Sequence, residues 1–191
     1  MEQAIASHLV EEFQGNTTTE AEFEAIFEIH RPKIFRFLLA SLRDTDAAEC
    51  LTQDCFLRAF QGLGRFRYEC GMSTWLMQIA LNLLRDHVRN RRLQFWKQAQ
   101  RNGLAGEELQ NWVVDRRDSP EAAALLKERV KAIWDAAAQL SGKQRTVFFL
   151  RFLEEMDLLE IAAVMRMKEG TVKVHLFRAL RAVRGKMETV R

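Results

Sequence analysis

The sequence predicts an all-α protein of two small helical modules joined by a flexible linker, with a helix-turn-helix in the C-terminal module. Only two prolines and nine glycines punctuate the 191 residues, and alternating Val, Ile and Thr are almost absent, so the signals of a β protein are missing. Apolar residues instead recur at three- and four-residue spacing, which is typical of amphipathic helices. With 48% hydrophobic residues, the chain can bury a sizeable core.

The chain begins with an acidic, weakly amphipathic extension over residues 1–20, and the first module follows over 21–92. Thr19 and Glu22 have the spacing of a capping box, which predicts the start of a first helix. Pro32 is expected to kink or divide this helix, because proline cannot supply the backbone donor of a helix interior. The apolar stripe of this helix comprises Phe23, Ile26, Phe27, Ile34 and Leu38.

Two more helices complete the predicted first module. The second starts after Asp44 or Asp46 and stops at Gly62 and Gly64. Its expected inward residues are Ala48, Leu51, Cys55, Ala59 and Phe60. A loop follows, and Ser73 or Thr74 can cap a third helix that ends near residue 92. The inner face of the third helix is expected to carry Trp75, Ile79, Ala80, Leu83 and Val88.

Residues 93–118 lack a sustained period and carry Gly103 and Gly106, which is typical of a linker. The second module, 119–191, follows directly after Asp118, where Pro120 suits a first helical turn and Glu121 suits the positive end of a helix dipole. Its helices are expected at 120–139, 142–154, 157–165 and 169–186.

The last two of these helices have the pattern of a helix-turn-helix. Asp157 and Glu160 form a capping box, and a three-residue break at 166–168 separates a short helix from a longer one. On the longer helix the expected buried stripe comprises Val172, Leu176, Ala179, Leu180 and Val183, and the outward set comprises Lys173, Val174, Phe177, Arg178 and Arg181. Residues 166–186 hold seven Lys or Arg against one acid, a net +6. A solvated basic helix would also carry this charge, but its coincidence with a helix-turn-helix favours DNA binding in the major groove.

Two further segments have opposite charge. Residues 65–101 hold eight Lys or Arg against two acids, interleaved with aromatic residues such as Tyr68 and Trp75, a combination that suits single-stranded or melting DNA. Trp75 is equally well explained as a core residue. Residues 44–54 contain four acids and no Lys or Arg, so this helix is expected to meet a protein rather than phosphate.

Several function classes are disfavoured. The three cysteines form no Cys-x-x-Cys pair and the four histidines are scattered, so we expect no metal site and no disulfide framework. The chain offers no phosphate loop or catalytic constellation, so we expect a protein that is not an enzyme and needs no cofactor. No apolar run or signal-peptide pattern is present, which predicts a cytoplasmic protein without membrane insertion.

Taken together, two blocks at about 22–92 and 121–187 resemble the bacterial RNA polymerase sigma factors of the extracytoplasmic-function (ECF) class. The first block carries Ala48-Glu49-Cys50-Leu51-Thr52-Gln53-Asp54 and, further on, Ser73-Thr74-Trp75-Leu76. The second carries Gln144-Arg145-Thr146-Val147-Phe148 and Gly170-Thr171-Val172-Lys173. Both blocks in this order and spacing are highly specific. The resemblance implies a factor that binds core polymerase, directs it to specific promoters and assists promoter melting in transcription initiation.

The resemblance also implies residue roles. Binding to core polymerase, at the β′ clamp coiled coil and the β subunit, would fall to Glu49, Gln53, Asp54 and Leu57. Minus-ten DNA would meet Arg67, Tyr68, Met72, Ser73, Trp75, Asn82, Arg85 and Arg89. Minus-thirty-five DNA would meet Thr171, Lys173, Val174, Phe177, Arg178 and Arg181. An anti-sigma factor is a further expected partner, because the family is commonly held inactive by one.

The sequence departs from the family in and near the turn of the helix-turn-helix. The family usually has Gly at Arg166, a capping Ser at Lys168 and often a small polar residue at Val174. Promoter preference therefore does not transfer by resemblance. The alternative function is a stand-alone helix-turn-helix regulator with a helical sensor domain, which would bind DNA without polymerase.

Overall fold

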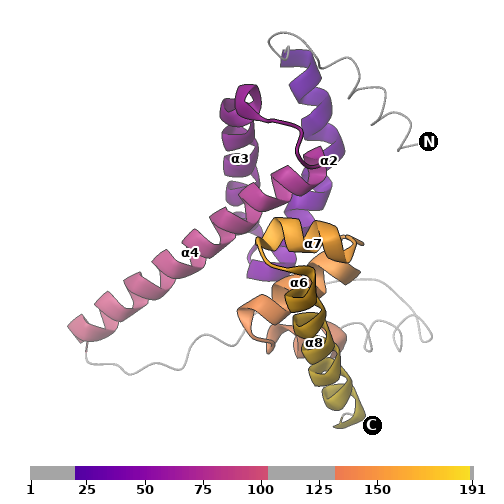
Figure 1. Cartoon of the computed structure of the whole chain (residues 1–191). Helices are drawn as coiled ribbons and strands as arrows, with labels where there is room; N and C mark the ends of the chain where they lie inside the picture. Colours follow the sequence, from indigo (N-terminus) through magenta and orange to yellow (C-terminus); the bar gives the residue numbers. More distant parts are fainter. Residues whose placement is uncertain (1–19, 103–131, 190–191) are drawn as a thin grey trace, which may run out of the picture.

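Helices make up all the regular secondary structure in the part of the chain that the computed structural model describes, residues 20–102 and 132–189 (Figure 1). The all-α prediction is therefore confirmed. The expected N-terminal extension, most of the expected linker and the first part of the helix expected at 120–139 lie outside the described residues.

Three helices form the first module: α2 (Glu20–Leu42), α3 (Thr45–Gly62) and α4 (Met72–Asn102). Each packs against the other two, and a short 3-10 helix, η1 (Leu63–Arg65), follows α3. Pro32 lies inside one continuous α2, so the chain is not divided there. Large fully buried side chains at the centre of this module are Ile34, Phe37, Leu38, Leu76, Met77 and Leu81.

Helix α3 begins where its capping residue predicts. The Asp44 side chain accepts a hydrogen bond of 3.0 Å from the Ala47 amide, which satisfies one of the free donors of the first turn. The prediction that Phe60 faces inward is wrong, because its side chain is 52% exposed. Phe56, one turn earlier, is buried instead. Phe60 lies near the C-terminal end of α3, where its ring makes a T-shaped contact with Phe23 of α2 but stays half exposed.

Helix α4 is longer than expected. It begins at Met72, before either predicted cap, and continues to Asn102, so residues 93–102 of the predicted linker are helical. No Gly or Pro interrupts the chain between those ends, and Gly103 is the first helix breaker. Val88 is exposed instead of inward, because α4 extends beyond the helices against which it packs.

The second module contains a short helical segment at 132–138 and the helices α6 (Gly142–Phe152), α7 (Leu158–Met165) and α8 (Glu169–Thr189). The predicted capping box is confirmed. The Asp157 carboxylate accepts a 2.7 Å hydrogen bond from the Glu160 backbone amide, and the Glu160 carboxylate accepts a 2.8 Å hydrogen bond from the Asp157 backbone amide. Val172, Ala179 and Val183 are buried, but Leu180 is 40% exposed because the buried stripe of α8 is narrower than predicted.

The two modules pack together. Helix α6 contacts α2, and α7 lies across α4 (Figure 1). In the described ranges, no helix is long and apolar enough to cross a membrane.

Candidate polymerase and DNA interfaces

The outward face of α3 brings together the four residues predicted to bind polymerase. Gln53, Asp54 and Leu57 are exposed on it, and Glu49 lies one turn earlier. The Glu49 carboxylate also forms a 2.6 Å ion pair with Arg31 of α2. This contact links the start of the α3 face to α2. The face is therefore acidic at its start and apolar toward its end.

Sequence reasoning missed one member of this face. Phe60 lies one turn beyond Leu57, and the two side chains are both more than half exposed. Exposed large apolar side chains that lie together are typical of a surface that binds another macromolecule. The i, i+3 spacing from Leu57 could have revealed Phe60, had it not also fitted the inward stripe.

Three aromatic rings gather where the loop after η1 meets the start of α4. Phe66 stacks on Trp75 with ring centroids 4.7 Å apart and an interplanar angle of 29°. The Tyr68 ring lies 4.7 Å from the Phe66 ring and is tilted by 55° to it. Trp75 is half-buried against the core, so both interpretations of this residue hold in part. Tyr68 is exposed and has a left-handed backbone with φ of 54°, which is unusual for a bulky residue. The three rings therefore form an aromatic cluster that runs from half-buried Trp75 to exposed Tyr68.

The other residues predicted to meet minus-ten DNA lie around and along α4. Met72 and Ser73 are half-buried in its first turn, and Arg67 is exposed in the preceding loop. Asn82, Arg85 and Arg89 are exposed and follow Trp75 at steps of seven, three and four residues, so they share one face of the helix. Arg89 donates a 3.0 Å bond to Asp86, an exposed pair that water screens.

Gln78 lies on this same face, between Trp75 and Asn82, and sequence reasoning did not select it. Its side-chain amide donates a 3.3 Å hydrogen bond to the Ala163 carbonyl of α7. The second module therefore occupies part of the face of α4 that is predicted to meet DNA.

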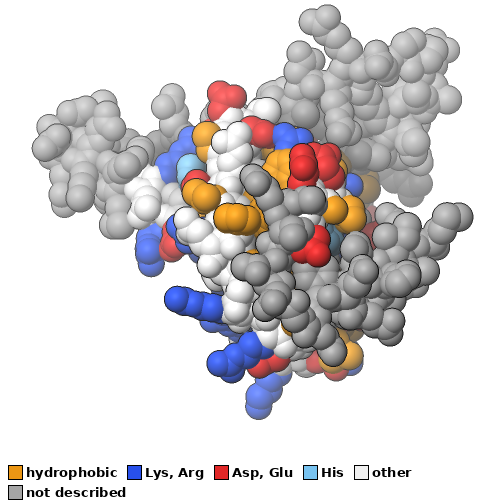
Figure 2. Space-filling model, turned by 90° about the horizontal axis from the view of Figure 1, so that it is seen from above, with side chains coloured by type: hydrophobic (Ala, Val, Ile, Leu, Met, Phe, Trp, Pro, Cys, Tyr) orange, Lys and Arg blue, Asp and Glu red, His pale blue; other side chains and the backbone are white. Residues whose placement is uncertain are grey.

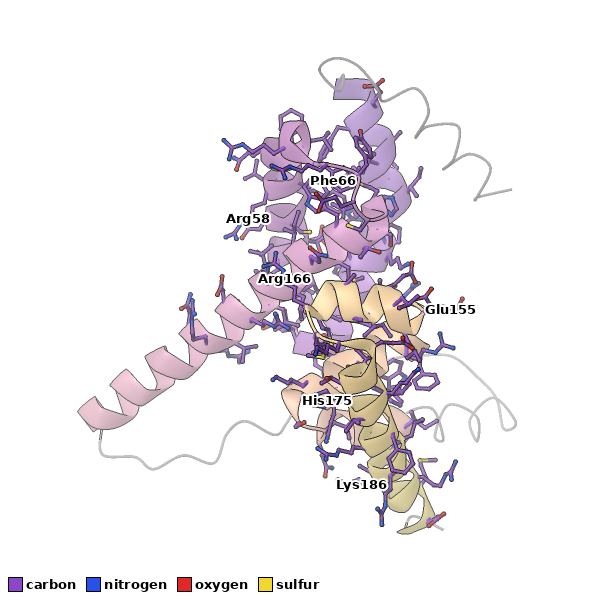
Figure 3. All side chains as sticks on the ribbon, viewed as in Figure 1. Arg58, Phe66, Glu155, Arg166, His175 and Lys186 are labelled. Carbon is purple, nitrogen blue, oxygen red and sulfur yellow. The ribbon has the colours of Figure 1, made fainter. Side chains whose placement is uncertain are left out.

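Helix α8 presents its predicted outward set to solvent. Thr171, Lys173, Val174, Phe177, Arg178 and Arg181 are all exposed, and Phe177 is 66% exposed. Lys173 forms a 2.7 Å ion pair with Glu169 within the helix. Arg166, which occupies the turn before α8, adopts a left-handed conformation with φ of 53° (Figure 3). The predicted recognition face is thus assembled on one helix, after a turn that carries backbone strain.

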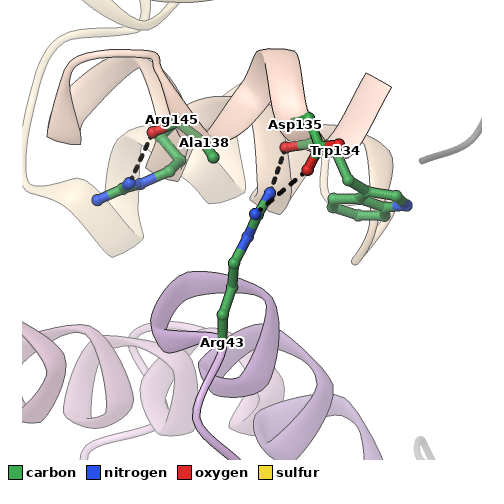
Figure 4. A network of polar contacts seen from close by, with 5 residues as sticks. All are labelled: Arg43, Trp134, Asp135, Ala138 and Arg145. Atoms are coloured by element: carbon green, nitrogen blue, oxygen red, sulfur yellow. Dashed lines mark hydrogen bonds and ion pairs between the residues drawn. The ribbon is translucent and has the colours of Figure 1, made fainter. Parts of the chain in front are cut away.

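Arg36 of α2 and Arg43, which follows α2, make polar contacts with the second module. Arg36 donates bonds of 3.1 and 2.8 Å to the two carboxylate oxygens of Glu154, whose side chain is fully buried. Burial raises the pKa of Glu154, and the hydrogen bonds from Arg36 oppose that shift. Arg43 reaches the Trp134 carbonyl at 2.7 Å and the Asp135 carboxylate at 3.3 Å (Figure 4). A residue from the first module therefore satisfies a charge that is buried in the second.

No group of three His, Cys, Asp or Glu side chains within 20–102 and 132–189 could hold a metal ion. Cys55 is buried, and its burial raises the thiol pKa to about 12. The pKa of Cys70 is also raised, by burial and by Glu69, so its reactive thiolate is disfavoured.

Comparison with known families agrees with this geometry. The model of sigma-70 region 2 matches residues 26–94, and the model of sigma-70 region 4 matches residues 131–183. The first range contains the α3 and α4 faces, and the second contains the helix-turn-helix.

Curated relatives match over nearly the whole chain. The ECF RNA polymerase sigma factor SigW of Bacillus subtilis is 29% identical over 184 residues, which cover 96% of this chain and 97% of SigW. The ECF sigma factor BldN of Streptomyces coelicolor is 31% identical over 184 residues, which cover 95% of this chain and 66% of BldN.

Solved structures share the fold. The sigma factor RpoE from Bartonella quintana, in complex with the anti-sigma factor NepR, has a TM-score of 0.66 at 19% identity, covering 89% of this chain and 99% of that chain. CnrH, in complex with the cytosolic domain of CnrY, has a TM-score of 0.64 at 20% identity, covering 98% of this chain and 97% of CnrH. With both sigma-70 regions matched in order, the chain belongs to the ECF class of RNA polymerase sigma factors, which direct the polymerase to promoters.

Proposed function

We propose that the three surfaces of this sigma factor divide the work of initiation. The outward face of α3 binds core polymerase at the β′ clamp coiled coil, and the second module contacts the β subunit. The loop before α4 and the exposed face of α4 bind the minus-ten element, and the exposed face of α8 binds the minus-thirty-five element. The polymerase supplies the catalytic chemistry, because sigma factors are initiation factors and not enzymes.

The aromatic cluster of Tyr68, Phe66 and Trp75 is the observation that carries the proposed melting role. The cluster begins half-buried at Trp75 and ends at Tyr68, whose exposed ring offers an aromatic face to an unpaired base. Stacking of one base on an aromatic ring contributes about 1 to 3 kcal/mol. The exposed guanidinium groups of Arg67 and Arg85 are available to the adjacent phosphates.

The packed arrangement of the modules cannot occupy both promoter elements. The elements lie about 25 base pairs apart, or about 85 Å along B-DNA at 3.4 Å per base pair. A folded chain of 191 residues has a radius of gyration of about 16 Å, and even its longest described helix, α4 with 31 residues, is only about 46 Å long. The 29 residues from 103 to 131 could span up to about 100 Å if extended, so the linker length permits separation. We therefore infer that the packed form is a resting form, which opens on polymerase.

An anti-sigma factor is a further proposed partner. RpoE and CnrH, which share this fold, were each solved with a protein partner, NepR and the cytosolic domain of CnrY. A partner that stabilised the packing of α7 on α4 would keep Gln78 and its neighbours from DNA.

Polymerase association tests the proposed role of α3. Asp54→Arg reverses an exposed charge in the middle of the face, and we expect association with purified core polymerase to fall at least tenfold in a pull-down or fluorescence titration. Glu28→Arg, at an exposed position on α2, makes the same change of charge and should leave association unchanged. Equal association by both variants would remove the α3 face from the interface.

Addition of the chain to core polymerase on promoter DNA tests the whole proposal. Promoter-directed transcription that requires only these two components supports it. Tight binding to a palindromic duplex without polymerase, with no gain of transcription, would favour the stand-alone regulator.

A further inference from the structure

Exposed apolar and basic side chains gather at the C-terminal end of α3 and in the loop after it. Leu57, Phe60 and Tyr68 are each about half exposed. Around them Arg58, Arg65 and Arg67 are exposed, and none of the three forms an ion pair with a carboxylate within the described ranges. We call these six residues the α3-end patch. Arg58 projects outward from α3 in Figure 3, away from the packed helices.

The chain enters α2 directly beside this patch. The Phe23 ring, in the first turns of α2, lies 5.0 Å from the Phe60 ring, and Glu22 is close enough to help raise the pKa of Tyr68. Figure 2 looks onto this end of the molecule and shows hydrophobic side chains at the surface next to acidic and basic ones. Whatever precedes residue 20 therefore leaves the structure next to the α3-end patch.

The sequence of that preceding segment is complementary to the patch. Ile5, Leu9 and Phe13 recur every four residues, and Ala6 and Val10 lie beside them in the same helical projection. Residues 1–13 also contain three acids, Glu2, Glu11 and Glu12, and no Lys or Arg. An apolar stripe flanked by acids matches an apolar patch flanked by arginines in both hydrophobicity and charge.

We propose that residues 2–13 of this chain, an acidic segment with regularly spaced apolar residues, dock on the α3-end patch. The reach is sufficient, because residues 14–19 can span up to about 20 Å. The docked segment covers the apolar end of the proposed polymerase face and the loop that carries Tyr68, so the inference rests on the proposed function of both surfaces.

Docking acts as an intramolecular competitor. Only molecules with an uncovered patch bind a minus-ten strand or polymerase, so the apparent affinity is reduced by the uncovered fraction. If the segment covers the patch in about 75 to 90% of molecules, the apparent affinity falls about 4- to 10-fold. Removal of the docking contacts should therefore raise both affinities by that factor.

Hydrogen exchange tests the docking without polymerase or DNA. The full chain is compared with the triple variant Ile5→Ser, Leu9→Ser, Phe13→Ser and with Glu11→Lys, Glu12→Lys, none of which alters a described residue. We expect peptides that cover residues 57–70 to lose protection at least threefold in both variants, at all protein concentrations. Unchanged exchange would overturn the proposal, even if the chain were fully active with polymerase. Protection that rises with protein concentration would also overturn it, since a second copy would then cover the patch.

A matched pair of variants on the described surface locates the site. Arg58→Glu with Arg65→Glu should reproduce the loss of protection. Arg178→Glu with Arg181→Glu makes the same change of charge on α8 and should leave residues 57–70 protected. Loss of protection in the α8 variant but not in the α3 variant would place the segment elsewhere and refute the assignment.

Binding of a single-stranded minus-ten oligonucleotide then tests the competition. The triple variant should bind 4- to 10-fold more tightly than the full chain, and a synthetic peptide of residues 1–19 should reverse the gain. Exchange could show release of the segment while the triple variant bound the oligonucleotide no more tightly than the full chain. The segment would then dock without competing with DNA, and the proposed competition would be wrong. If no variant bound the oligonucleotide at all, the minus-ten role would fail while the exchange result still stood.

Discussion

Removal of the Arg36 guanidinium should shift the two modules from the packed to the separated form. Arg36 makes two charge-assisted hydrogen bonds, of 3.1 and 2.8 Å, to a Glu154 side chain with 0% exposure. Such bonds contribute about 1.5 to 3 kcal/mol each, and loss of one partner from a buried pair costs about 3 to 5 kcal/mol. Because the Arg36 side chain is 52% exposed, its contribution is screened, and we expect about 2 to 3 kcal/mol for Arg36→Ala.

The loss falls on the packing equilibrium because separation lets water solvate the freed carboxylate of Glu154. A cost of about 2 to 3 kcal/mol lowers the packed-to-separated ratio about 30- to 150-fold. Small-angle scattering should then show a larger radius of gyration for Arg36→Ala than for the parent protein. Arg31→Ala removes an ion pair to Glu49 inside the first module and should leave the radius unchanged.

Acid supplies a second readout for the same variant. Burial raises the pKa of Glu154, so the packed form binds its proton more tightly than the separated form does. Packing is then favoured as pH falls through that raised pKa, and is weakened as pH rises through it. Mild acid should therefore partly restore the packed form of the Arg36→Ala protein. The charge-swapped double variant, Arg36→Glu with Glu154→Arg, should also be packed. A variant as compact as the parent protein at neutral pH would refute the reasoning.

Three other changes test separate parts of the chain. Arg178→Ala should weaken minus-thirty-five binding by about 1 to 3 kcal/mol and alter sequence preference if the side chain reads a base edge, whereas a uniform loss across sequences in a competition assay would make it a phosphate contact. Arg166→Gly should stabilise the chain against urea by about 0.5 to 1 kcal/mol, since glycine adopts its φ of 53° without strain but loses more entropy on folding; a destabilised variant would contradict this. Iodoacetamide at pH 8 should modify exposed Cys50 and spare Cys55, whose thiol has a pKa of about 12, until the chain unfolds; early modification of Cys55 in a peptide map would show that the helix opens.

Local signals predicted the helices well where a capping residue or a breaker was present. Asp44 and the Asp157–Glu160 box mark helix starts that the structure reproduces, because a cap satisfies donors within its own first turn. The predicted end of α4 was wrong because a run of basic and polar residues is compatible with a helix when no Gly or Pro stops it. The resemblance assigned DNA and polymerase roles to residues that lie on exposed faces, and those roles stay predictions.

The sequence by itself determined the all-α class, the helix-turn-helix, the acidic face of α3 and the basic face of α8, because each depends on neighbours within two turns of one helix. Only the tertiary structure decided that Phe60, Val88 and Leu180 are exposed, since burial depends on where a neighbouring helix ends. It alone paired Arg36 with Glu154, 118 positions apart, and set Gln78 against α7. No periodic sequence pattern indicates these contacts, because they arise from the packing of one module against the other.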